Sequence, residues 1–247
     1  MDRLIYSSLA AMRGAMSRQA TIANNLANVN TAGFRGEMAN AQSLWIVGKG
    51  LNGRATVSGE VQGADMEGGA VTATGRDLDV ALDGDALLAV QASDGSEAYT
   101  RRGDLKLSDS GLLTTGDGTP VLGDRGPITL PPSDKISIGP DGTISIVPQG
   151  GDPKDMQQVD RLKLASPAGS TIAKGVDGLF RVKGGGALPS DPDARLTAKS
   201  LEGSNVNASQ ALVDMINTSR SWETQVKMLT TAQDLDKAST ALMQLPD

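Results

Sequence analysis

The chain has 247 residues and a formal net charge of −6, and it contains no histidine and no cysteine. These absences exclude Ser-His-Asp and Cys-His catalytic sites, disulfides, and the usual ligands of zinc, haem and iron–sulfur centres. The acidic charge and an aromatic content of 2% argue against nucleic-acid binding. No apolar run approaches the roughly 18 residues of a membrane span, and polar residues interrupt any secretory signal at the start. We therefore expect no cofactor, no small-molecule substrate and no membrane insertion.

Glycine and proline are concentrated in the middle of the chain, which predicts helical ends and a β-rich centre. We expect an α+β fold in which paired, coiled-coil-like N- and C-terminal helices flank a central all-β domain. The expected parts are an N-terminal helix with a signature motif at 1–36, an extended connector at 37–72, the β domain at 73–200 and the C-terminal helix at 201–247.

The first 30 residues carry a row of side chains at alternating spacings of four and three, which is typical of a coiled-coil helix. The row consists of Ile5, Leu9, Met12, Met16, Gln19, Ala23 and Leu26. A second row at spacing seven contains Ala15, Ile22 and Val29. We expect the helix to end within residues 28–33, because asparagine and glycine adopt the left-handed conformations that terminate helices.

Residues 207–243 predict a longer helix that begins at a capping box, Asn207 to Gln210. Its apolar row consists of Leu212, Met215, Trp222, Val226, Leu229, Ala232, Leu235, Ala238, Leu242 and Leu245. Such a helix is about 55 Å long, whereas a compact globule of this chain length is about 46 Å across. The apolar row therefore has to meet the N-terminal helix, other subunits or both; packing within one chain alone is the simpler alternative.

The middle of the chain predicts short antiparallel strands. Apolar residues alternate with polar or small ones over 78–82, 136–138 and 143–147. Asp-Gly pairs, which are typical of hairpin turns, stand at 83–84, 94–95, 117–118 and 141–142.

Two motifs in the chain resemble small-ligand sites. Residues 48–53 match G-x-G-x-x-G, but the following residues are β-branched and broken by glycine, so we interpret them as a flexible connector. A cluster of carboxylates consists of Asp77, Asp79, Asp83 and Asp85. It lacks the EF-hand spacing and any aromatic platform for a sugar, so we interpret it as a hairpin turn and a solvated face. A secreted carbohydrate-binding or carbohydrate-active β domain is the alternative function from another class.

Three segments carry a resemblance to one family. Residues 22–35, with the sequence Ile-Ala-Asn-Asn-Leu-Ala-Asn-Val-Asn-Thr-Ala-Gly-Phe-Arg, resemble the signature of flagellar basal-body rod and hook proteins. Residues 74–85 and 99–105 are similar to the central β domain of that family, and residues 201–223 contain its C-terminal motif. The opening residues and the short length resemble the proximal-rod member, with a distal-rod or hook-type axial protein as the alternative.

The resemblance implies a structural, non-catalytic subunit of the periplasm-spanning rod that assembles through its terminal helices and transmits torque. It also implies export in an unfolded state through the flagellar type III apparatus, without a cleaved signal peptide. The implied partners are copies of the chain, other rod proteins and the export apparatus. We expect the terminal segments to be largely disordered in the monomer and to order on docking.

The expected assembly interface combines apolar side chains of both helices with polar residues of the two terminal motifs. It consists of Ile22, Asn24, Asn25, Leu26, Asn28, Val29, Asn30, Gly33, Phe34, Ser204, Asn205, Val206, Asn207, Trp222, Glu223, Val226 and Leu229. The asparagine amides are expected to bind backbone across the joint, and Gly33 is expected to let the chain turn out of the helix. We expect no catalytic, metal-ligating or cofactor-binding residue.

Overall fold

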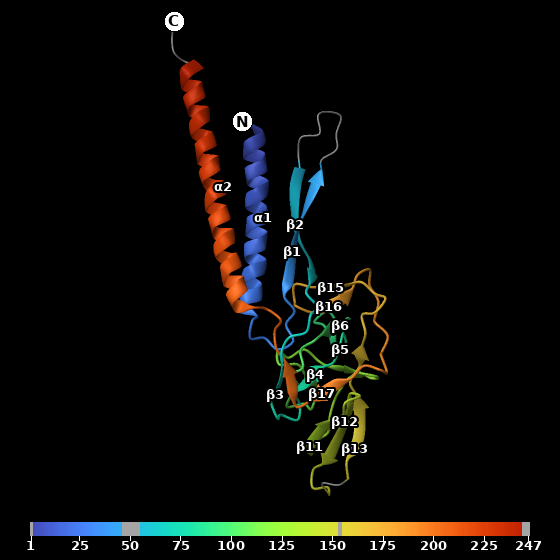
Figure 1. Ribbon diagram of the computed structural model, residues 1–247. Coiled ribbons are helices and arrows are strands. Elements are labelled where there is room, and N and C mark those ends of the chain that lie inside the picture. The colour runs from blue at the N-terminus through green and yellow to red at the C-terminus, as the bar shows by residue number, and fades with distance from the viewer. Residues whose placement is uncertain (1, 46–54, 153–154, 244–247) are drawn as a thin grey trace. The chain divides into compact units, whose positions relative to one another are not determined.

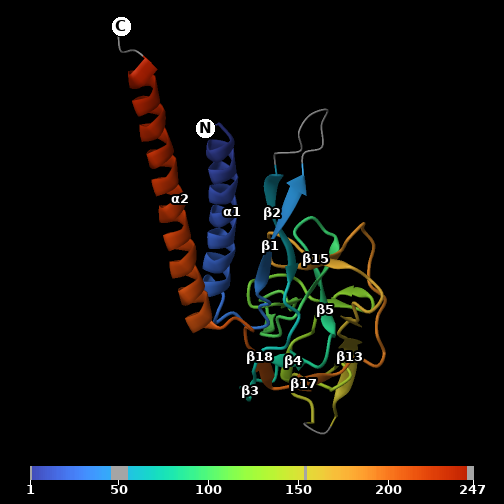
Figure 2. The ribbon, with the colours of Figure 1, turned by 45° about the horizontal axis from the view of Figure 1, so that its top comes forward.

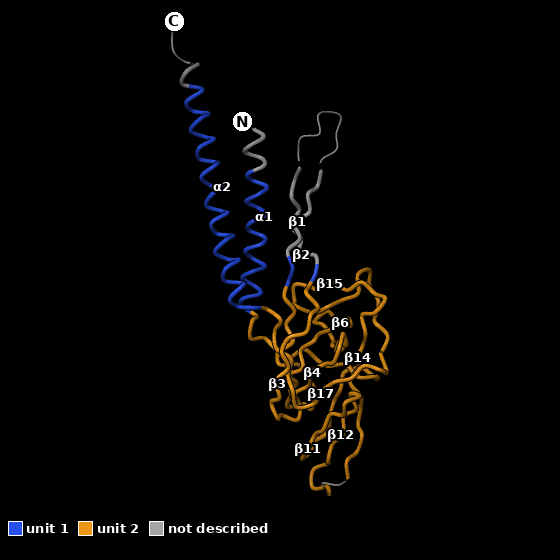
Figure 3. The backbone as a smooth tube through the Cα atoms, in the orientation of Figure 1, with its two compact units in different colours: residues 1–27, 37–63, 207–247 blue, residues 28–36, 64–206 orange. Residues whose placement is uncertain are grey.

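The computed structural model describes residues 2–45, 55–152 and 155–243. The chain divides into two compact units (Figure 3). Unit 1 consists of residues 1–27, 37–63 and 207–247, and unit 2 consists of residues 28–36 and 64–206. The predicted α+β fold, with a helix at each end of the sequence and a β-rich centre, is confirmed (Figure 1).

Unit 1 is built on a helix pair, α1 (Asp2–Ala27) and α2 (Ala208–Met243), which pack along each other (Figures 1 and 2). The 36 residues of α2 make it about 54 Å long. Among the described residues, neither helix combines the length and the apolar character needed to cross a membrane.

The rest of unit 1 corrects the prediction of an extended connector over 37–72. Strands β1 (Glu37–Trp45) and β2 (Ala55–Ala64) pair in a two-stranded sheet, and β1 packs against α1. The physical reason is that an extended backbone needs partners for its N–H and C=O groups, which a second strand supplies. The G-x-G-x-x-G match at 48–53 lies outside the described residues.

Over residues 8–27, the part of α1 whose burial is described, the buried residues are small and none of them belongs to the predicted coiled-coil row; Ile5 of that row lies outside this range. Ser8, Gly14, Ala15 and Thr21 are buried, whereas Met16 of the predicted row is 58% exposed. The sequence contains two apolar rows, and spacing alone did not show which row faces the partner. Small side chains at buried positions allow the backbones of packed elements to approach closely.

Unit 2 is made of short strands, and every described pairing between them is antiparallel. The strands are β3 (Val71–Ala73), β4 (Val80–Leu82), β5 (Leu87–Gln91), β6 (Glu97–Thr100), β7 (Lys106–Leu107), β8 (Leu113–Thr114), β9 (Leu122–Gly123), β10 (Gly126–Pro127), β11 (Ser133–Ile138), β12 (Thr143–Pro148), β13 (Gln157–Arg161), β14 (Leu164–Ala165), β15 (Ile172–Lys174), β16 (Phe180–Val182), β17 (Leu196–Ala198) and β18 (Ser200–Glu202).

The core of unit 2 surrounds a five-stranded sheet of order β14-β5-β6-β16-β15. Successive residues of β5 enter different hydrophobic clusters: Leu88 and Val90 belong to one cluster, and Leu87 and Ala89 to another. Both faces of this strand are therefore covered, because side chains alternate between the faces of a sheet. In the separate sheet β11-β12-β13, Ile144 and Ile146 of β12 are buried in alternation, as predicted.

Two expectations about the polar residues of unit 2 were wrong. The Asp-Gly pairs at 94–95 and 141–142 do connect hairpin strands, but the pair at 83–84 joins β4 and β5, which pair with other strands. Asp79 is buried rather than solvated. Its carboxylate accepts a 2.6 Å hydrogen bond from the Thr74 hydroxyl and lies 3.5 Å from the Arg76 guanidinium, and these partners offset its desolvation.

The chain also divides at different points from those expected. Residues 28–36 and 201–206 belong to unit 2, and β18 occupies residues predicted as the start of the C-terminal helix. The helix begins at Ala208, where Asn207 Oδ1 accepts a 3.1 Å hydrogen bond from the Gln210 amide. The side chain of Gln210 donates from Nε2 to the Asp214 carboxylate at 2.9 Å.

Candidate functional site at the signature turn and the helix pair

The signature turn, residues 28–36, lies against the loop that follows β6. Gly33 adopts a φ of +65°, and its amide donates to the Glu202 carbonyl at 2.8 Å. A Cβ atom on Gly33 would lie 2.2 Å from the Arg101 carbonyl oxygen. Glycine is therefore required twice over at this position, by the left-handed conformation and by the close backbone approach.

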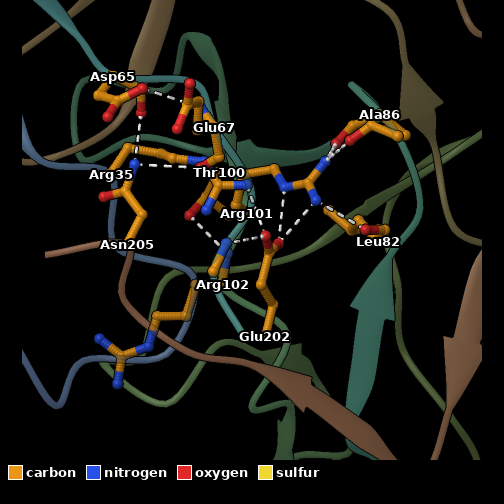
Figure 4. Close-up of polar contacts among 12 residues, drawn as sticks. Arg35, Asp65, Glu67, Leu82, Ala86, Thr100, Arg101, Arg102, Glu202 and Asn205 are labelled. Atoms are coloured by element: carbon orange, nitrogen blue, oxygen red, sulfur yellow. Dashed lines mark hydrogen bonds and ion pairs between the residues drawn. The ribbon is translucent and has the colours of Figure 1, made fainter. Parts of the chain in front are cut away.

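Glu202 is the centre of a buried ionic cluster, here called the Glu202 cluster, that it forms with Arg35 and Arg101 (Figure 4). Its Oε1 accepts from Nη2 of Arg35 at 2.7 Å and from the Gly69 amide at 3.0 Å. Its Oε2 accepts from Nε and Nη2 of Arg101 at 2.9 and 2.7 Å. Four bonds use the full acceptor capacity of the carboxylate.

Arg101 is equally well satisfied, because all five of its N–H groups have acceptors. Besides its bonds to Glu202, Nη1 donates to the carbonyls of Gly84 and Ala86, at 2.6 and 2.8 Å, and Nη2 donates to that of Leu82, at 2.7 Å. Leu82 is the last residue of β4, and Gly84 and Ala86 lie in the turn between β4 and β5. Burial lowers the pKa of the Arg101 guanidinium from its ordinary value, while the charge of Glu202 acts in the opposite direction.

Arg35 is the less satisfied member of the Glu202 cluster. Its side chain is buried, and its Nε and Nη1 have no hydrogen-bond partner among the described residues. Two guanidinium groups thus share one carboxylate. Loss of that carboxylate would leave two buried cations without their common partner. Removal of one partner of a buried ion pair strongly lowers the stability of the fold.

Asn205 joins the signature turn to residues 65–67. Its Oδ1 accepts from the Gly36 amide at 2.7 Å, and its Nδ2 donates to the carbonyls of Asp65 and Glu67 at 3.0 and 3.1 Å (Figure 4). The Asp65 amide in turn donates to the Gly36 carbonyl at 2.8 Å. Residues 33–36, 65–69 and 202–205 are therefore held together inside unit 2.

Phe34 and Lys174 close this arrangement on the side of β15. The Lys174 ammonium lies 3.7 Å from the centre of the Phe34 ring and donates to the Arg35 carbonyl at 3.0 Å. A cation over an aromatic ring is favourable in itself. The aromatic residue of the signature therefore fixes the turn against the sheet.

The helix pair of unit 1 has large apolar side chains that are exposed. Leu212 is 50% exposed and Ile216 is 54% exposed on α2. Met16 and Leu9 on α1 are also exposed. Leu212 and Ile216 stand four residues apart and Leu9 and Met16 seven apart, so each pair lies on one face of its own helix. Exposed apolar side chains gathered on a face are candidates for contact with another molecule.

The residues predicted as one assembly interface fall into two groups. The group in unit 1 consists of Ile22, Asn24, Asn25, Leu26, Asn207, Trp222, Glu223, Val226 and Leu229, and the group in unit 2 consists of Asn28, Val29, Asn30, Gly33, Phe34, Ser204, Asn205 and Val206. In unit 1, Trp222 and Leu229 are half-buried, and Glu223 and Val226 are exposed.

Of the four predicted asparagines in residues 24–30, three bind groups within their own chain. Asn24 donates to the Glu37 carboxylate at 2.7 Å, and Asn25 exchanges two hydrogen bonds with the Glu37 backbone, at 2.8 and 2.9 Å. Asn28 accepts from the Thr31 hydroxyl at 3.1 Å. These bonds shape the end of α1 and the start of β1.

The described residues contain no cluster of three or more acidic side chains placed to hold a metal ion. The four aspartates of residues 77–85 do not converge: Asp77 pairs with Lys199 at 2.9 Å, and Asp83 accepts from Thr197 at 3.2 Å. A hydrogen bond from Lys199 lowers the pKa of Asp77.

Three family models match the chain in order. They are "Flagella basal body rod protein" over residues 5–35, "Flagellar hook protein FlgE/F/G D1 domain" over 81–146 and "Flagellar basal body rod FlgEFG protein C-terminal" over 197–242. The chain is 39% identical to flagellar basal-body rod protein FlgF of Salmonella typhimurium, over 99% of this chain and 100% of the relative. It is 41% identical to FlgF of Escherichia coli over 95% of each chain.

The chain belongs to the flagellar basal-body rod protein family. It is also 31% identical to FlgG of Bacillus subtilis, over 95% of this chain and 97% of the relative, and its likeness to FlgF of the two enteric bacteria is greater. The family role is that of a structural rod subunit in the flagellar basal body.

The Glu202 cluster is the part of the site that was not predicted. Arg35 and Glu202 stand inside motifs that the sequence displays, and Arg101 stands in the segment similar to the central β domain. Arginine and glutamate are almost never fully buried unless they are paired, and the sequence does not show which distant residue supplies the partner. The available signal was their position inside specific motifs whose other members are glycine, asparagine and apolar residues.

Proposed function

We propose that this chain is a proximal-rod subunit that assembles, with copies of itself and with other rod proteins, through the apolar surface of its helix pair. The observation that carries the proposal is the exposure of Leu212, Ile216 and Met16 on helices that already pack along each other. Full burial of a side chain of this size contributes about 1.5–3 kcal/mol. Half of that surface is still available for contact with neighbouring molecules.

The likeness to FlgF supports the proximal position and the role in torque transmission. The two named FlgF relatives match the chain over nearly its whole length at about 40% identity, whereas the FlgG match is at 31%. We extend the proposal to export through the flagellar type III apparatus without cleavage of a signal peptide, followed by assembly in the basal body. Mass spectrometry of purified basal bodies tests the absence of cleavage and the assembly in the basal body. Detection of the chain with its N-terminal residue retained supports both, and a shortened N-terminus contradicts the absence of cleavage.

We further propose that the helix pair is marginally ordered before docking and becomes rigid in the rod. The apolar surface left exposed on both helices supports this, because helices in water draw most of their stability from tertiary packing. Circular dichroism and amide exchange of the monomer measure it. Helices that are fully protected from exchange at micromolar concentration would contradict the idea.

Substitution of Ile216 by aspartate tests the assembly proposal. Ile216 is a better position for this test than Leu26 or Trp222. Those two side chains are half-buried, so their replacement would disturb the folding of the chain itself. We expect Ile216→Asp to keep the helical circular dichroism of the purified chain but to lose incorporation into basal bodies and swimming.

The matched control is Asn217→Asp, which adds the same charge at the neighbouring exposed position and removes no apolar surface. We expect this variant to swim. Normal incorporation of the Ile216→Asp variant would overturn the proposed use of this surface.

A further inference from the structure

The chain passes between the two units four times, at residues 27–28, 36–37, 63–64 and 206–207. In unit 2, these passages continue into three short segments: the signature turn, residues 64–69 and residues 202–206. Any force carried along the chain from one unit to the other enters unit 2 through these segments. The residues that fix them are therefore of mechanical interest.

Glu202 contacts all three segments. It lies in the third, it binds Arg35 of the signature turn through Oε1 and it binds the Gly69 amide of the second through the same oxygen. Its carbonyl accepts from the Gly33 amide. Through Oε2 it is joined to Arg101, whose remaining donors hold the turn between β4 and β5.

We propose that Glu202 is a positioning residue whose carboxylate locks the three segments into one cooperative element. This element opens and closes as a unit, separately from the rest of the β domain. Its consequence for assembly rests on the proposed function, but the locking itself does not.

The signature turn has few apolar contacts of its own. It contains no fully buried large apolar side chain: Val29, Ala32 and Phe34 are half-buried, and its buried residues are two glycines and an arginine. This is little apolar surface to offset the entropy of ordering nine residues. Its order therefore depends on polar contacts, and the strongest of these converge on one carboxylate. Hydrogen bonds to charged groups contribute more than neutral ones.

Charge makes the coupling stronger. Arg35 and Arg101 are both buried and both cationic, and Glu202 is the anion that they share. Without the carboxylate, the two guanidinium groups repel each other in a poorly solvated place. Arg101 stays attached to the β4–β5 turn by three carbonyls, so Arg35 and the signature turn are the parts that would leave.

Native-state amide hydrogen exchange on the full chain measures the proposed lock. Five amides report on the three segments: those of Gly33, Gly36, Asp65, Gly69 and Asn205. In the unaltered chain we expect all five to exchange with one common opening free energy and one denaturant dependence, lower than those of the β11-β12-β13 sheet. Five unrelated values would overturn the proposal, and this arm requires no variant.

The variant Glu202→Gln keeps the shape of the side chain and removes its charge. We expect the protection of all five amides to fall by the same factor, on the order of 100-fold for the loss of charged hydrogen bonds, while the β11-β12-β13 sheet is unchanged. The matched control is Glu97→Gln, which alters a half-buried ion pair with Lys163 in the same unit. A loss confined to the Gly69 amide, whose acceptor is altered directly, would overturn the proposal.

Assembly assays separate this inference from the proposed function. We expect cells with Glu202→Gln to lose swimming, and cells with Glu97→Gln to keep it. If the five amides move together but Ile216→Asp assembles normally, the lock stands and the proposed docking surface fails. If Ile216→Asp blocks assembly but the five amides respond independently, the docking surface stands and the lock fails.

Discussion

The helix pair and the β-rich unit 2 bury their apolar residues to very different extents. In unit 2, Leu88 and Ile144 are completely buried among other side chains of the same unit. In the helix pair, Met16 and Ile216 are more than half exposed. The difference shows that unit 2 completes its core within one chain, whereas the apolar sequence of the helices exceeds what their mutual packing covers.

The largest contrast is expected from leucine truncation in the two regions. Leu88→Ala removes a fully buried side chain and should lower the free energy of unfolding by about 2–5 kcal/mol. Leu212→Ala removes a half-exposed side chain and should change it by less than about 0.5 kcal/mol. Urea unfolding of the purified chain measures both, and effects of equal size would break the contrast between the two regions.

The next contrast lies within unit 2, between two glycines that share a positive φ. Gly33→Ala places a Cβ atom against the Arg101 carbonyl. We expect it to lower the free energy of unfolding by about 3 kcal/mol or more, because backbone strain adds to the forced separation of the signature turn from the loop after β6. Gly75→Ala has a similar φ but no atom within 4 Å of the new Cβ, so only backbone strain of about 1–2 kcal/mol remains.

Thermal unfolding followed by near-ultraviolet circular dichroism measures these two variants. The difference between them isolates the contact of the signature turn with the loop after β6. If Gly33→Ala is no worse than Gly75→Ala, that contact does not hold the turn.

Replacement of a buried alanine by leucine tests which side chains of α1 are packed. Ala15 is 1% exposed, so Ala15→Leu should lower the midpoint of helix unfolding by an amount corresponding to about 1–3 kcal/mol of overpacking. Ala20 is exposed on the same helix, and Ala20→Leu should leave the midpoint nearly unchanged. Far-ultraviolet circular dichroism records the midpoint, and equal behaviour of the two variants would show that the helices do not pack through Ala15.

The smallest effect is expected from acid. Hydrogen bonds from Thr143 lower the pKa of Asp141, and hydrogen bonds from Arg181 lower that of Asp177. The unfolded chain therefore binds more protons than the folded chain near the ordinary aspartate pKa of 3.8. The stability of unit 2 should be fully present above that pH and should fall gradually below it.

Urea midpoints between pH 6 and pH 3 measure this slope. The Asp177→Asn variant should show a shallower slope, because it lacks one of the groups that titrate differently in the two states. Stability that rises as the pH falls would contradict the assignment of these carboxylates.

The sequence was sufficient for the elements whose pattern is local. The helical ends, the cap at Asn207 and the hairpin turns at 94–95 and 141–142 follow from residue spacing and turn chemistry, which act over a few neighbouring residues. The strand pair β1–β2 was missed because its alternation is weak. In β2, Val57 and Val61 alternate with polar residues, but two glycines occupy the same alternating series of positions, and most apolar residues of β1 are alanines or stand at its end. The site was predicted in part: Gly33, Phe34 and Asn205 are in it, whereas Arg101 and Glu202 were not foreseen.

What the amino-acid sequence alone determined is that a helix at each end of the chain flanks a strand-rich centre, and that Asn207 caps the second helix. Which of the two apolar rows of α1 is buried, and which charged residues lie inside, was decided only by the tertiary structure. The reason is that burial and ion pairing depend on partners such as Arg35 and Glu202, which are separated by more than 160 positions in the chain. Local spacing carries no information about such distant partners, whereas packing brings them within hydrogen-bond distance.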